Sequence, residues 1–196
     1  QIGILLVQSV INSFGSTAIA GYSAGMRIES LSIVPMLAMG NAMSTFTAQN
    51  MGAGKIDRVK EGYRMCYVIV LTAGAVLCVM YQLAGGAFVS LFLDSGSSEA
   101  YSVGLSYVKF LSFFYSFIGL KASTDGLLRG AGDVTAFTVA NLVNLAIRVS
   151  VTNLFAPVYG IQVAWMAVPL GWAANYVISF GWYLTGKWKK VRVIKK

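Results

Sequence analysis

The segment from Met65 to Ala84 reads MCYVIVLTAGAVLCVMYQLA and contains no charged residue over 20 positions. A transmembrane helix needs about 20 predominantly apolar residues to cross a hydrocarbon core of about 30 Å. This segment is therefore predicted to cross a membrane within a helix near 56–84. Cys66 and Cys78 lie 12 residues apart on that helix. They are roughly 18 Å apart at the α-helical rise, which is too far for a disulfide.

The rest of the chain has the same character. Hydrophobic residues make up 57% of the 196 residues, the mean hydropathy is +0.69 and only 11% of residues are charged, whereas about 25% is usual for a soluble domain. We therefore expect an all-α, polytopic membrane protein, a six-helix transmembrane bundle over 1–186 with a basic tail at 187–196. The other helices are expected near 1–14, 18–50, 97–130, 134–155 and 161–186.

The first of these helices is shorter than a crossing requires, because 14 residues give only about 21 Å. The chain also opens at Gln1 inside an apolar run without a charged flank. We expect this helix to be truncated and the sequence to be part of a longer one. In the long second helix, Pro35 is expected to produce a bend because it removes one backbone hydrogen bond.

The basic residues are clustered beside the apolar segments, which explains the net charge of +8. The last ten positions contain six of the fifteen, and 55–64 contain four more. The connections between these basic ones, near 85–98 and 157–160, contain no Lys or Arg. Asp94 and Glu99 therefore lie on the side of the membrane opposite to the basic clusters. The positive-inside rule then predicts that the C-terminus is cytoplasmic, with Trp182, Tyr183 and Trp188 at the inner boundary. The clusters lack interleaved base-stacking aromatics, which argues against nucleic-acid binding.

Polar residues within the predicted spans are candidates for function, because a charge in the membrane is costly unless it is paired or hydrated. Asn141, Asn144 and Arg148 follow one another at i, i+3 and i+7, so they share one helix face. We expect this stripe to face a cavity or a neighbouring helix, and a substrate role and a structural tether are both open. The first helix adds Gln8 and Asn12 as cavity candidates.

Two further groups of charges lie nearer the predicted helix ends. Lys121 and Asp125 are four residues apart and can form an ion pair, with Arg129 one turn further on; we interpret these three as an inner gate or packing group rather than a proton-coupling site. Arg27 and Glu29 lie more than 30 Å from Gly52 by the helical rise. We expect them at the outer interface as anchors or outer-gate contacts.

Thr47 to Lys55 read TAQNMGAGK, and 126–133 read GLLRGAGD. Together with NSFG at 12–15, IAGY at 19–22 and Leu91–Phe92 followed by Asp94, these stretches resemble the MATE (multidrug and toxic compound extrusion) transporter family. The residues of the first turn that carry the resemblance are Gln49, Asn50, Gly52, Gly54 and Lys55. Gly52, Gly54, Gly130 and Gly132 are expected to provide positive φ angles at the turns rather than a phosphate cradle.

The resemblance implies a twelve-helix protein with two six-helix lobes, of which this chain is the second. It also implies efflux of amphipathic or cationic compounds in exchange for H⁺ or Na⁺, without another cofactor or a bound metal. The implied partners are the missing N-terminal lobe of the same polypeptide and the lipid bilayer, and the implied location is the plasma membrane.

This sequence departs from the NorM-type members of the family, which carry acidic residues in the first and fourth helices of this lobe. Here the first helix offers Gln8 and Asn12, and 115–120 contain no acid. We therefore expect the titrating carboxylate in the first lobe. Of the many aromatic and Met side chains, only a minority is expected to line a substrate cavity.

Other functions are less consistent with the sequence. A lipid-linked saccharide flippase of the same superfamily would share the helix plan, but it would need a basic cavity, for which this lobe offers little beyond Arg148 and Lys121. An intramembrane enzyme would need a nucleophile with a base or a metal cluster, and the chain contains no His. A channel would need a filter-like loop, and a homodimerising half-transporter would not explain the short first helix.

Overall fold

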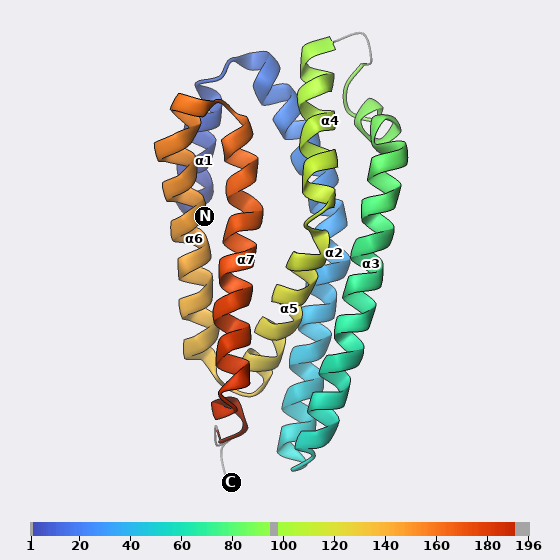
Figure 1. The fold of residues 1–196 in the computed structure, drawn as a ribbon, viewed down its shortest axis with the longest axis vertical. Coiled ribbons are helices and arrows are strands. Elements are labelled where there is room, and N and C mark those ends of the chain that lie inside the picture. The colour runs from blue at the N-terminus through green and yellow to red at the C-terminus, as the bar shows by residue number, and fades with distance from the viewer. Residues whose placement is uncertain (1, 95–97, 191–196) are drawn as a thin grey trace.

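The computed structural model describes residues 2–94 and 98–190, which form a bundle of long helices without a strand in that part of the chain (Figure 1). The helices are α1 (Ile2–Asn12), α2 (Ser16–Gly52), α3 (Ile56–Ser90), α4 (Ser98–Ser112), α5 (Tyr115–Gly130), α6 (Val134–Tyr159) and α7 (Gln162–Leu184), followed by the short 3-10 helix η1 (Lys187–Lys190). The basic tail predicted at 187–196 therefore begins with a helical turn.

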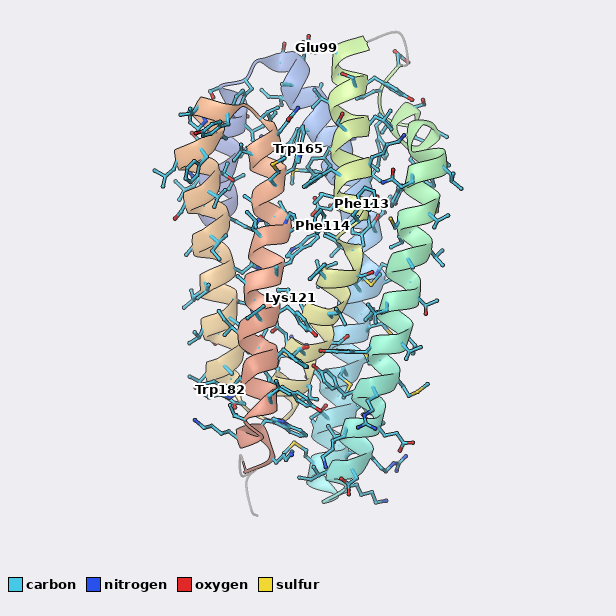
Figure 2. The ribbon with its side chains drawn as sticks, in the orientation of Figure 1. Glu99, Phe113, Phe114, Lys121, Trp165 and Trp182 are labelled. Atoms are coloured by element: carbon cyan, nitrogen blue, oxygen red, sulfur yellow. The ribbon has the colours of Figure 1, made fainter. Side chains whose placement is uncertain are left out.

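Successive connections alternate between the two ends of the bundle (Figure 1). The turns at 53–55 and 131–133 lie at the end where the chain reaches η1, and we call this the basic end. The connections at 13–15, 91–94 and Gly160 lie at the opposite end. Figure 2 shows Trp182 near the basic end and Glu99 at the opposite end. The folded chain thus separates the basic connections from the acidic Asp94 and Glu99, as the sequence predicted.

Four helices, α2, α3, α6 and α7, are long and apolar enough to cross a membrane, and the bent pair of α4 and α5 meets the same criteria when it is counted as one broken crossing. The prediction of one helix over 97–130 was wrong, because the chain bends by 52° between α4 and α5. Phe113 and Phe114 lie at the break. Pro35, in contrast, lies inside α2, which the structure assigns as one continuous helix.

A side chain from α3 compensates for the helical hydrogen bonds lost at this break. The Gln82 amide donates to the Lys109 carbonyl oxygen at 2.8 Å and to Ser112 Oγ at 2.9 Å. Backbone groups inside a membrane must find partners within the protein, because lipid tails offer none. Gln82 therefore makes the broken crossing compatible with a membrane interior.

Close contact between α2 and α5 fixes the centre of the bundle. A Cβ atom added to Gly126 would lie 2.1 Å from the Gly40 carbonyl oxygen, and one added to Gly130 would lie 2.2 Å from the Ser44 carbonyl oxygen. Small residues at such contacts let helix backbones approach closely in membranes. Gly130 is thus required for packing, and the prediction that it has a positive φ was wrong.

The two glycine turns at the basic end each use one residue with a positive φ. These are Gly54, at 71°, and Gly132, at 83°. Gly52 is the last residue of α2 and has no positive φ. The prediction of a positive φ at Gly52 was therefore also wrong. The helices need only one left-handed residue per turn, because the preceding glycine still belongs to the helix.

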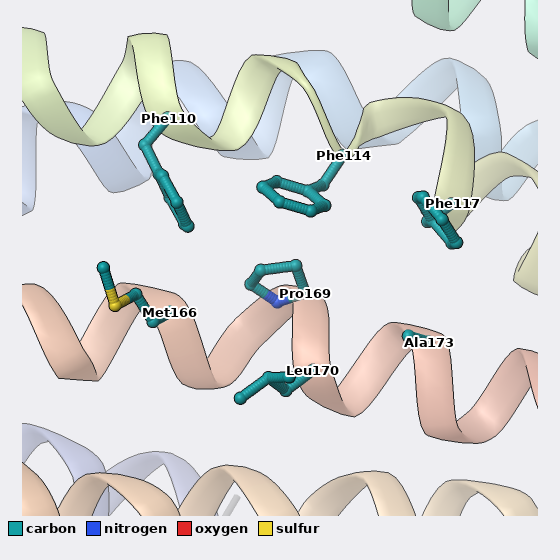
Figure 3. Close-up of a pocket in the computed structure, with 7 residues that line it drawn as sticks. All are labelled: Phe110, Phe114, Phe117, Met166, Pro169, Leu170 and Ala173. Carbon is teal, nitrogen blue, oxygen red and sulfur yellow. The ribbon is translucent and has the colours of Figure 1, made fainter.

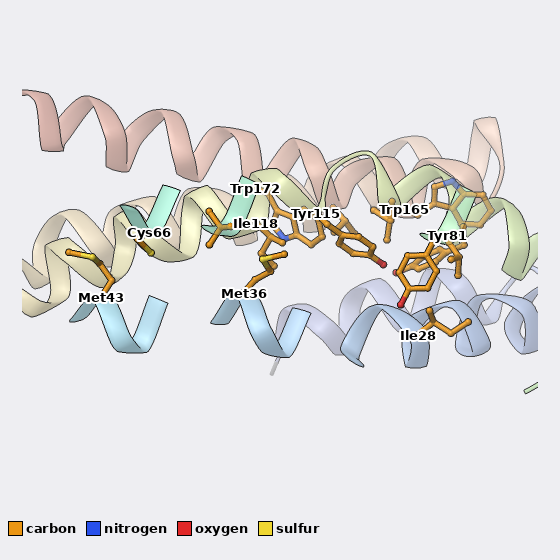
Figure 4. Close-up of a cluster of buried hydrophobic side chains, with 14 of the residues drawn as sticks. Ile28, Met36, Met43, Cys66, Tyr81, Tyr115, Ile118, Trp165 and Trp172 are labelled. Carbon is orange, nitrogen blue, oxygen red and sulfur yellow. The ribbon is translucent and has the colours of Figure 1, made fainter. Parts of the chain in front are cut away.

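The buried core follows the contact between α2 and α5 and includes Met36, Ile118 and Trp172 (Figure 4). Both cysteines lie on α3 and are free, as predicted. Near the basic end the Trp182 indole donates to Asp133 Oδ2 at 2.6 Å. Since Asp133 also caps α6, this bond ties the start of α6 to the end of α7.

Candidate functional site

Four polar side chains from three helices form one connected group between α5, α6 and α7, which we call the paired cluster: Lys121, Asp125, Asn141 and Ser179. The Lys121 ammonium lies 2.9 Å from Asp125 Oδ2 and donates to Asn141 Oδ1 at 3.1 Å. Asn141 and Ser179 donate to the two Asp125 oxygens at 3.2 and 2.7 Å. Both charges therefore have an opposite partner, and both carboxylate oxygens accept a hydrogen bond.

The helix geometry explains why these groups meet. Lys121 and Asp125 stand one turn apart on α5, as their i, i+4 spacing predicted, and their side chains are only 13% and 6% exposed. The close contact between α2 and α5 described above holds this part of α5 in place. A cavity of about 280 Å³ adjoins the cluster. The hydrogen bonds from Asn141 on α6 and Ser179 on α7 connect this buried pair to both neighbouring helices.

Arg129 lies one turn beyond the cluster but does not join it. Its guanidinium donates to Asn41 Oδ1 at 2.8 Å and to Ser44 Oγ at 3.3 Å, both on α2. It also lies 5.8 Å from the centre of the Phe137 ring. Arg129 therefore connects α5 to α2 at the basic end, and it shares the adjoining cavity with Lys121 and Asp125.

A second polar site lies between α1, α2 and α6, in a cavity of about 200 Å³. We call it the Glu29–Arg148 cavity, and its lining residues are Val7, Gln8, Tyr22, Met26, Glu29, Ser30, Ile33, Leu145 and Arg148. Glu29 is buried, and its carboxylate accepts a hydrogen bond from the Tyr107 hydroxyl on α4. Arg148 is close enough to interact electrostatically with Glu29.

The two charges of this cavity do not form a direct ion pair. The ion pairs within 4.0 Å that the structure shows are Lys60–Asp57 and Lys121–Asp125, and the Arg148 guanidinium and the Glu29 carboxylate do not form one. Arg148 is half-buried and its stem packs against α7 near Gly171, where an added Cβ would lie 3.0 Å from Arg148 Cγ. The aliphatic stem of Arg148 is thus packed against α7, while its guanidinium forms no ion pair with Glu29.

Glu29 is buried and hydrogen-bonded to Tyr107 rather than an exposed anchor, and its place near the outer interface stays a prediction. It was measured from the basic end of a helix that is longer than a membrane crossing, since α2 contains 37 residues. Measured from Ser16 at the other end, Glu29 lies about 20 Å along the helix axis. Arg27 fits the prediction better, because its guanidinium lies 5.9 Å from the Phe92 ring of the connection after α3.

The polar stripe on α6 divides between the two sites. Asn141 belongs to the paired cluster, and Arg148 lines the Glu29–Arg148 cavity. Asn144 lies between them, against Gly171, and its buried Oδ1 atom has no partner. One helix face therefore contributes to two separate sites, because α6 contacts α5 near one end and α1 near the other.

Of the two cavity candidates on α1, one lines a cavity and the other does not. Gln8 lines the Glu29–Arg148 cavity, whereas Asn12 is exposed and is not part of its lining. The Gln8 amide donates to Asn12 Oδ1 at 3.1 Å. Asn12 thus contacts the cavity only through Gln8.

The residues of the first glycine turn form hydrogen bonds that shape the turn between α2 and α3. Asn50 donates its amide to the Phe46 carbonyl oxygen at 2.8 Å, and the Lys55 amide group donates to the Asn50 carbonyl oxygen at 2.7 Å. The chain passes through Gly52 and Gly54 between these bonds, one turn after Gln49. These contacts end α2 and start α3, so the motif positions helices at the basic end.

An apolar cavity of about 310 Å³ lies between the broken crossing and α7 (Figure 3). Phe110, Phe114 and Phe117 project from α4 and α5 toward Met166 and Pro169 of α7. Aromatic rings and a flexible thioether adapt to ligands of varied shape. That some of the aromatic residues line a substrate cavity stays a prediction, and Phe110, Phe114 and Phe117 are the candidates here.

Sequence analysis missed several members of these sites. Tyr22 and Tyr107 were not singled out, and neither was Ser179 on α7. Their types are ordinary in membrane helices, and only the neighbouring helix reveals their role. For Glu29, which the sequence did single out, the chain contained a signal of its position. Thirteen residues of α2 precede it, so it lies several turns away from the opposite end of the bundle.

Comparison with known proteins identifies the fold. The MatE family model matches residues 2–154. The chain belongs to the MATE family. Over 192 residues it is 29% identical to the probable multidrug resistance protein YpnP of Bacillus subtilis, covering 97% of this chain and 43% of that protein. It is 22% identical to the probable multidrug resistance protein NorM of Thermotoga maritima, covering 99% of this chain and 42% of that protein.

A crystal structure of MATE in the bent conformation has the same fold, with a TM-score of 0.84 at 17% identity. The match covers 95% of this chain and 42% of the solved one. The chain thus spans less than half the length of the relatives that it matches, and it corresponds to one lobe of the MATE fold. It is a multi-pass membrane protein.

Proposed function

We propose that this chain is the C-terminal lobe of a secondary active multidrug efflux transporter. The transporter exchanges small amphipathic or cationic compounds for H⁺ or Na⁺, and its lobes alternate access to a central cavity. The single observation that carries this proposal is the match of the MATE family model to residues 2–154. The proposed partner is the N-terminal lobe of the same polypeptide.

The positive-inside rule supports the orientation of the lobe. Lys55, Arg58 and Lys60 lie beside the turn that joins α2 and α3, at the same end as Lys187. Positive residues near short connections favour the cytoplasmic side. We therefore propose a location in the plasma membrane with the basic end in the cytoplasm.

The cavities support a transporter of amphipathic compounds. Ligand sites combine apolar walls with a few polar groups that fix orientation. The cavity around Phe114 provides the first property, and the Glu29–Arg148 cavity provides the second. A lipid-linked saccharide flippase fits less well, because Lys121 is paired with Asp125 and Arg148 shares its cavity with Glu29.

We place the coupling carboxylate in the other lobe. Asp125 is occupied by Lys121, Asn141 and Ser179. Glu29 is buried and accepts a hydrogen bond from the Tyr107 hydroxyl. Both carboxylates are thus engaged by side chains of this lobe.

Efflux of a cationic dye from vesicles that contain the full-length protein tests the proposal. The H⁺ and Na⁺ gradients are imposed separately, and one of them is expected to drive efflux. Vesicles with the protein but without a gradient are the control. Dye movement that is insensitive to both gradients would contradict the proposal.

The place of the coupling carboxylate has its own test. Neutralising the membrane carboxylates of the other lobe, one at a time and together, is expected to abolish the gradient dependence. The matched variants Glu29→Gln and Asp125→Asn are expected to keep it. If coupling survives the combined neutralisation, the carboxylate lies in this lobe instead.

A further inference from the structure

One tryptophan fixes the short helix η1 to the basic end of the bundle. Trp188 is fully buried, and its ring stacks on Tyr183 of α7 with the ring centres 5.6 Å apart. Its indole N–H donates to the Tyr183 carbonyl oxygen at 3.1 Å. The Tyr183 ring in turn lies 4.6 Å from the Tyr63 ring of α3. This stack of three aromatic rings connects η1 and the start of α3 through the end of α7.

Basic side chains from α3 and η1 gather around this stack. Lys60 and Arg64 stand one helical turn apart on α3, and both are close enough to Tyr183 to interact with it electrostatically. Lys189 of η1 lies over the Trp188 ring, 5.7 Å from its centre. We call Lys60, Arg64 and Lys189 the basic patch. Two elements that are far apart in the sequence thus contribute to one group of charges.

The charges of the basic patch are only partly compensated. Lys60 pairs with Asp57 at 2.7 Å, and Lys189 is close enough to Asp57 to interact with it electrostatically. Arg64 and Lys189 are exposed and take part in none of the ion pairs within 4.0 Å that the structure shows. Like charges that a fold holds together create a positive potential, which attracts an anion.

Apolar side chains continue the basic patch toward the predicted membrane interior. Val68 follows Arg64 by one turn of α3 and is 56% exposed. On α7, the half-buried Phe180 ring stacks against Tyr183 at 6.0 Å. Tyrosine and tryptophan rings favour the level of the lipid headgroups, and Figure 2 shows Trp182 near the basic end. The site therefore combines cations at headgroup level with an apolar surface beside them.

We propose that the basic patch binds the headgroup of an anionic phospholipid of the cytoplasmic leaflet. The Arg64 guanidinium has a planar fork of donors that matches two phosphate oxygens, and Lys189 adds a point charge. The acyl chains lie along Val68 and Phe180. Clusters of Lys and Arg at the cytoplasmic end of a transmembrane helix are typical of such recognition. This inference goes beyond the proposed function, and because it is tested without a gradient, either can fail alone.

The test measures lipid binding to the detergent-solubilised full-length protein by native mass spectrometry. Phosphatidylglycerol is the anionic probe, and phosphatidylcholine with the same acyl chains is the zwitterionic control. The wild-type protein is expected to bind phosphatidylglycerol about tenfold more tightly. Arg64→Gln and Lys189→Gln are each expected to weaken that binding roughly fivefold, which corresponds to about 1 kcal/mol per basic residue at a membrane surface. Unchanged binding in either variant would overturn the inference.

Two matched controls separate a site from diffuse surface charge. Arg58 lies about 140° around α3 from Tyr63, on the flank opposite to Arg64. Lys187 of η1 lies over the Trp182 ring instead, 5.0 Å from its centre. Arg58→Gln and Lys187→Gln make the same change of charge on the same two elements, and each should change phosphatidylglycerol binding less than about twofold. Losses as large as that of Arg64→Gln would mean that the net charge of the basic end attracts the lipid, and the inference is then wrong.

The role of Trp188 has its own comparison. Trp188→Ala keeps every charge but removes the stack that positions η1, so it is expected to weaken phosphatidylglycerol binding about as much as Lys189→Gln. Trp188→Phe keeps a stacking ring and should retain most of the binding, which preserves the comparison if Trp188→Ala fails to fold. Wild-type binding in a folded Trp188→Ala variant would mean that Lys189 acts without a fixed position, which contradicts the proposed site.

A soluble phosphate has the same charge chemistry as the lipid headgroup. Glycerol 3-phosphate carries this charge without acyl chains, and a large excess of it is expected not to displace phosphatidylglycerol, because the apolar surface beside the basic patch contributes only to the lipid. Displacement by the soluble compound would assign the basic patch to a soluble phosphate and overturn the lipid assignment.

Discussion

The paired cluster and the Glu29–Arg148 cavity contain the same kinds of charge in opposite arrangements. In the cluster, Lys121 and Asp125 lie 2.9 Å apart, and Asn141 and Ser179 complete the hydrogen bonds. In the cavity, Glu29 and Arg148 face one space without contact at ion-pair distance.

The difference follows from how the charges are attached. Lys121 and Asp125 stand on one helix at i, i+4, so their distance is set by the helix itself. Glu29 and Arg148 belong to α2 and α6, and their distance depends on how these helices are placed. A pair within one helix remains closed when helices move, whereas a pair between helices can open for a ligand. The first arrangement suits structure, and the second suits binding.

The largest expected effect is the loss of the buried pair in the cluster. Asp125→Ala leaves the Lys121 ammonium without its counter-charge and should lower the free energy of unfolding by about 3–5 kcal/mol. Denaturant titration of the detergent-solubilised full-length protein measures it. The double variant Lys121→Met with Asp125→Leu should recover most of the loss. A loss below about 1 kcal/mol for Asp125→Ala would remove the contrast between the two sites.

The next effect concerns the link between the cluster and α7. Ser179→Ala removes the donor that lies 2.7 Å from Asp125 Oδ1. It should destabilise the protein by about 1.5–3 kcal/mol, which is typical of a hydrogen bond to a charged group. In the background of Asp125→Ala the same substitution should have almost no effect. Equal effects in the two backgrounds would mean that Ser179 acts independently of the carboxylate.

A third substitution tests the helix contact that positions the cluster. Gly126→Ala places a Cβ atom 2.1 Å from the Gly40 carbonyl oxygen and should lower the free energy of unfolding by about 1–3 kcal/mol through overpacking. The matched control is Gly52→Ala, because a Cβ atom there meets nothing within 4 Å. This control should stay within about 0.5 kcal/mol of the wild-type protein. Similar losses for both variants would mean that the loss at Gly126 does not come from its contact with Gly40, because Ala has the higher helix propensity at both positions.

The smallest effect on stability is expected in the cavity. Arg148→Gln removes a charge that has no ion-pair partner, so the free energy of unfolding should change by less than about 1 kcal/mol. The same titration measures it, side by side with Lys121→Gln, which should cost several times more. A large loss for Arg148→Gln would show that Arg148 and Glu29 pair directly in the folded protein.

The sequence predicted much of the fold because the decisive signals are local. The apolar segments, the basic connections and the pairing of Lys121 with Asp125 each depend on residues that are close in the chain. The broken crossing was missed because Phe113 and Phe114 are ordinary helix residues in an apolar setting. The break becomes possible only where Gln82, on another helix, supplies the missing hydrogen bonds.

The candidate sites were predicted in part. Gln8, Arg148 and the members of the ion pair were identified, but Asn141 and Arg148 were expected to act together. Glu29 was predicted near the outer interface as an anchor or outer-gate contact, and the structure adds that it is buried. Its burial depends on Tyr107 of α4 and on α1 and α6, which sequence position does not reveal.

The sequence by itself determined that the chain crosses a membrane, because about 20 apolar residues suffice to make hydrocarbon a better environment than water. It also determined which connections are basic. Only the tertiary structure decided which charges are paired and which stay open to a cavity. The physical reason is that electrostatic and hydrogen-bond energies depend on distances of a few ångström between helices, and those distances are fixed by packing at sites such as Gly126 and Gly171.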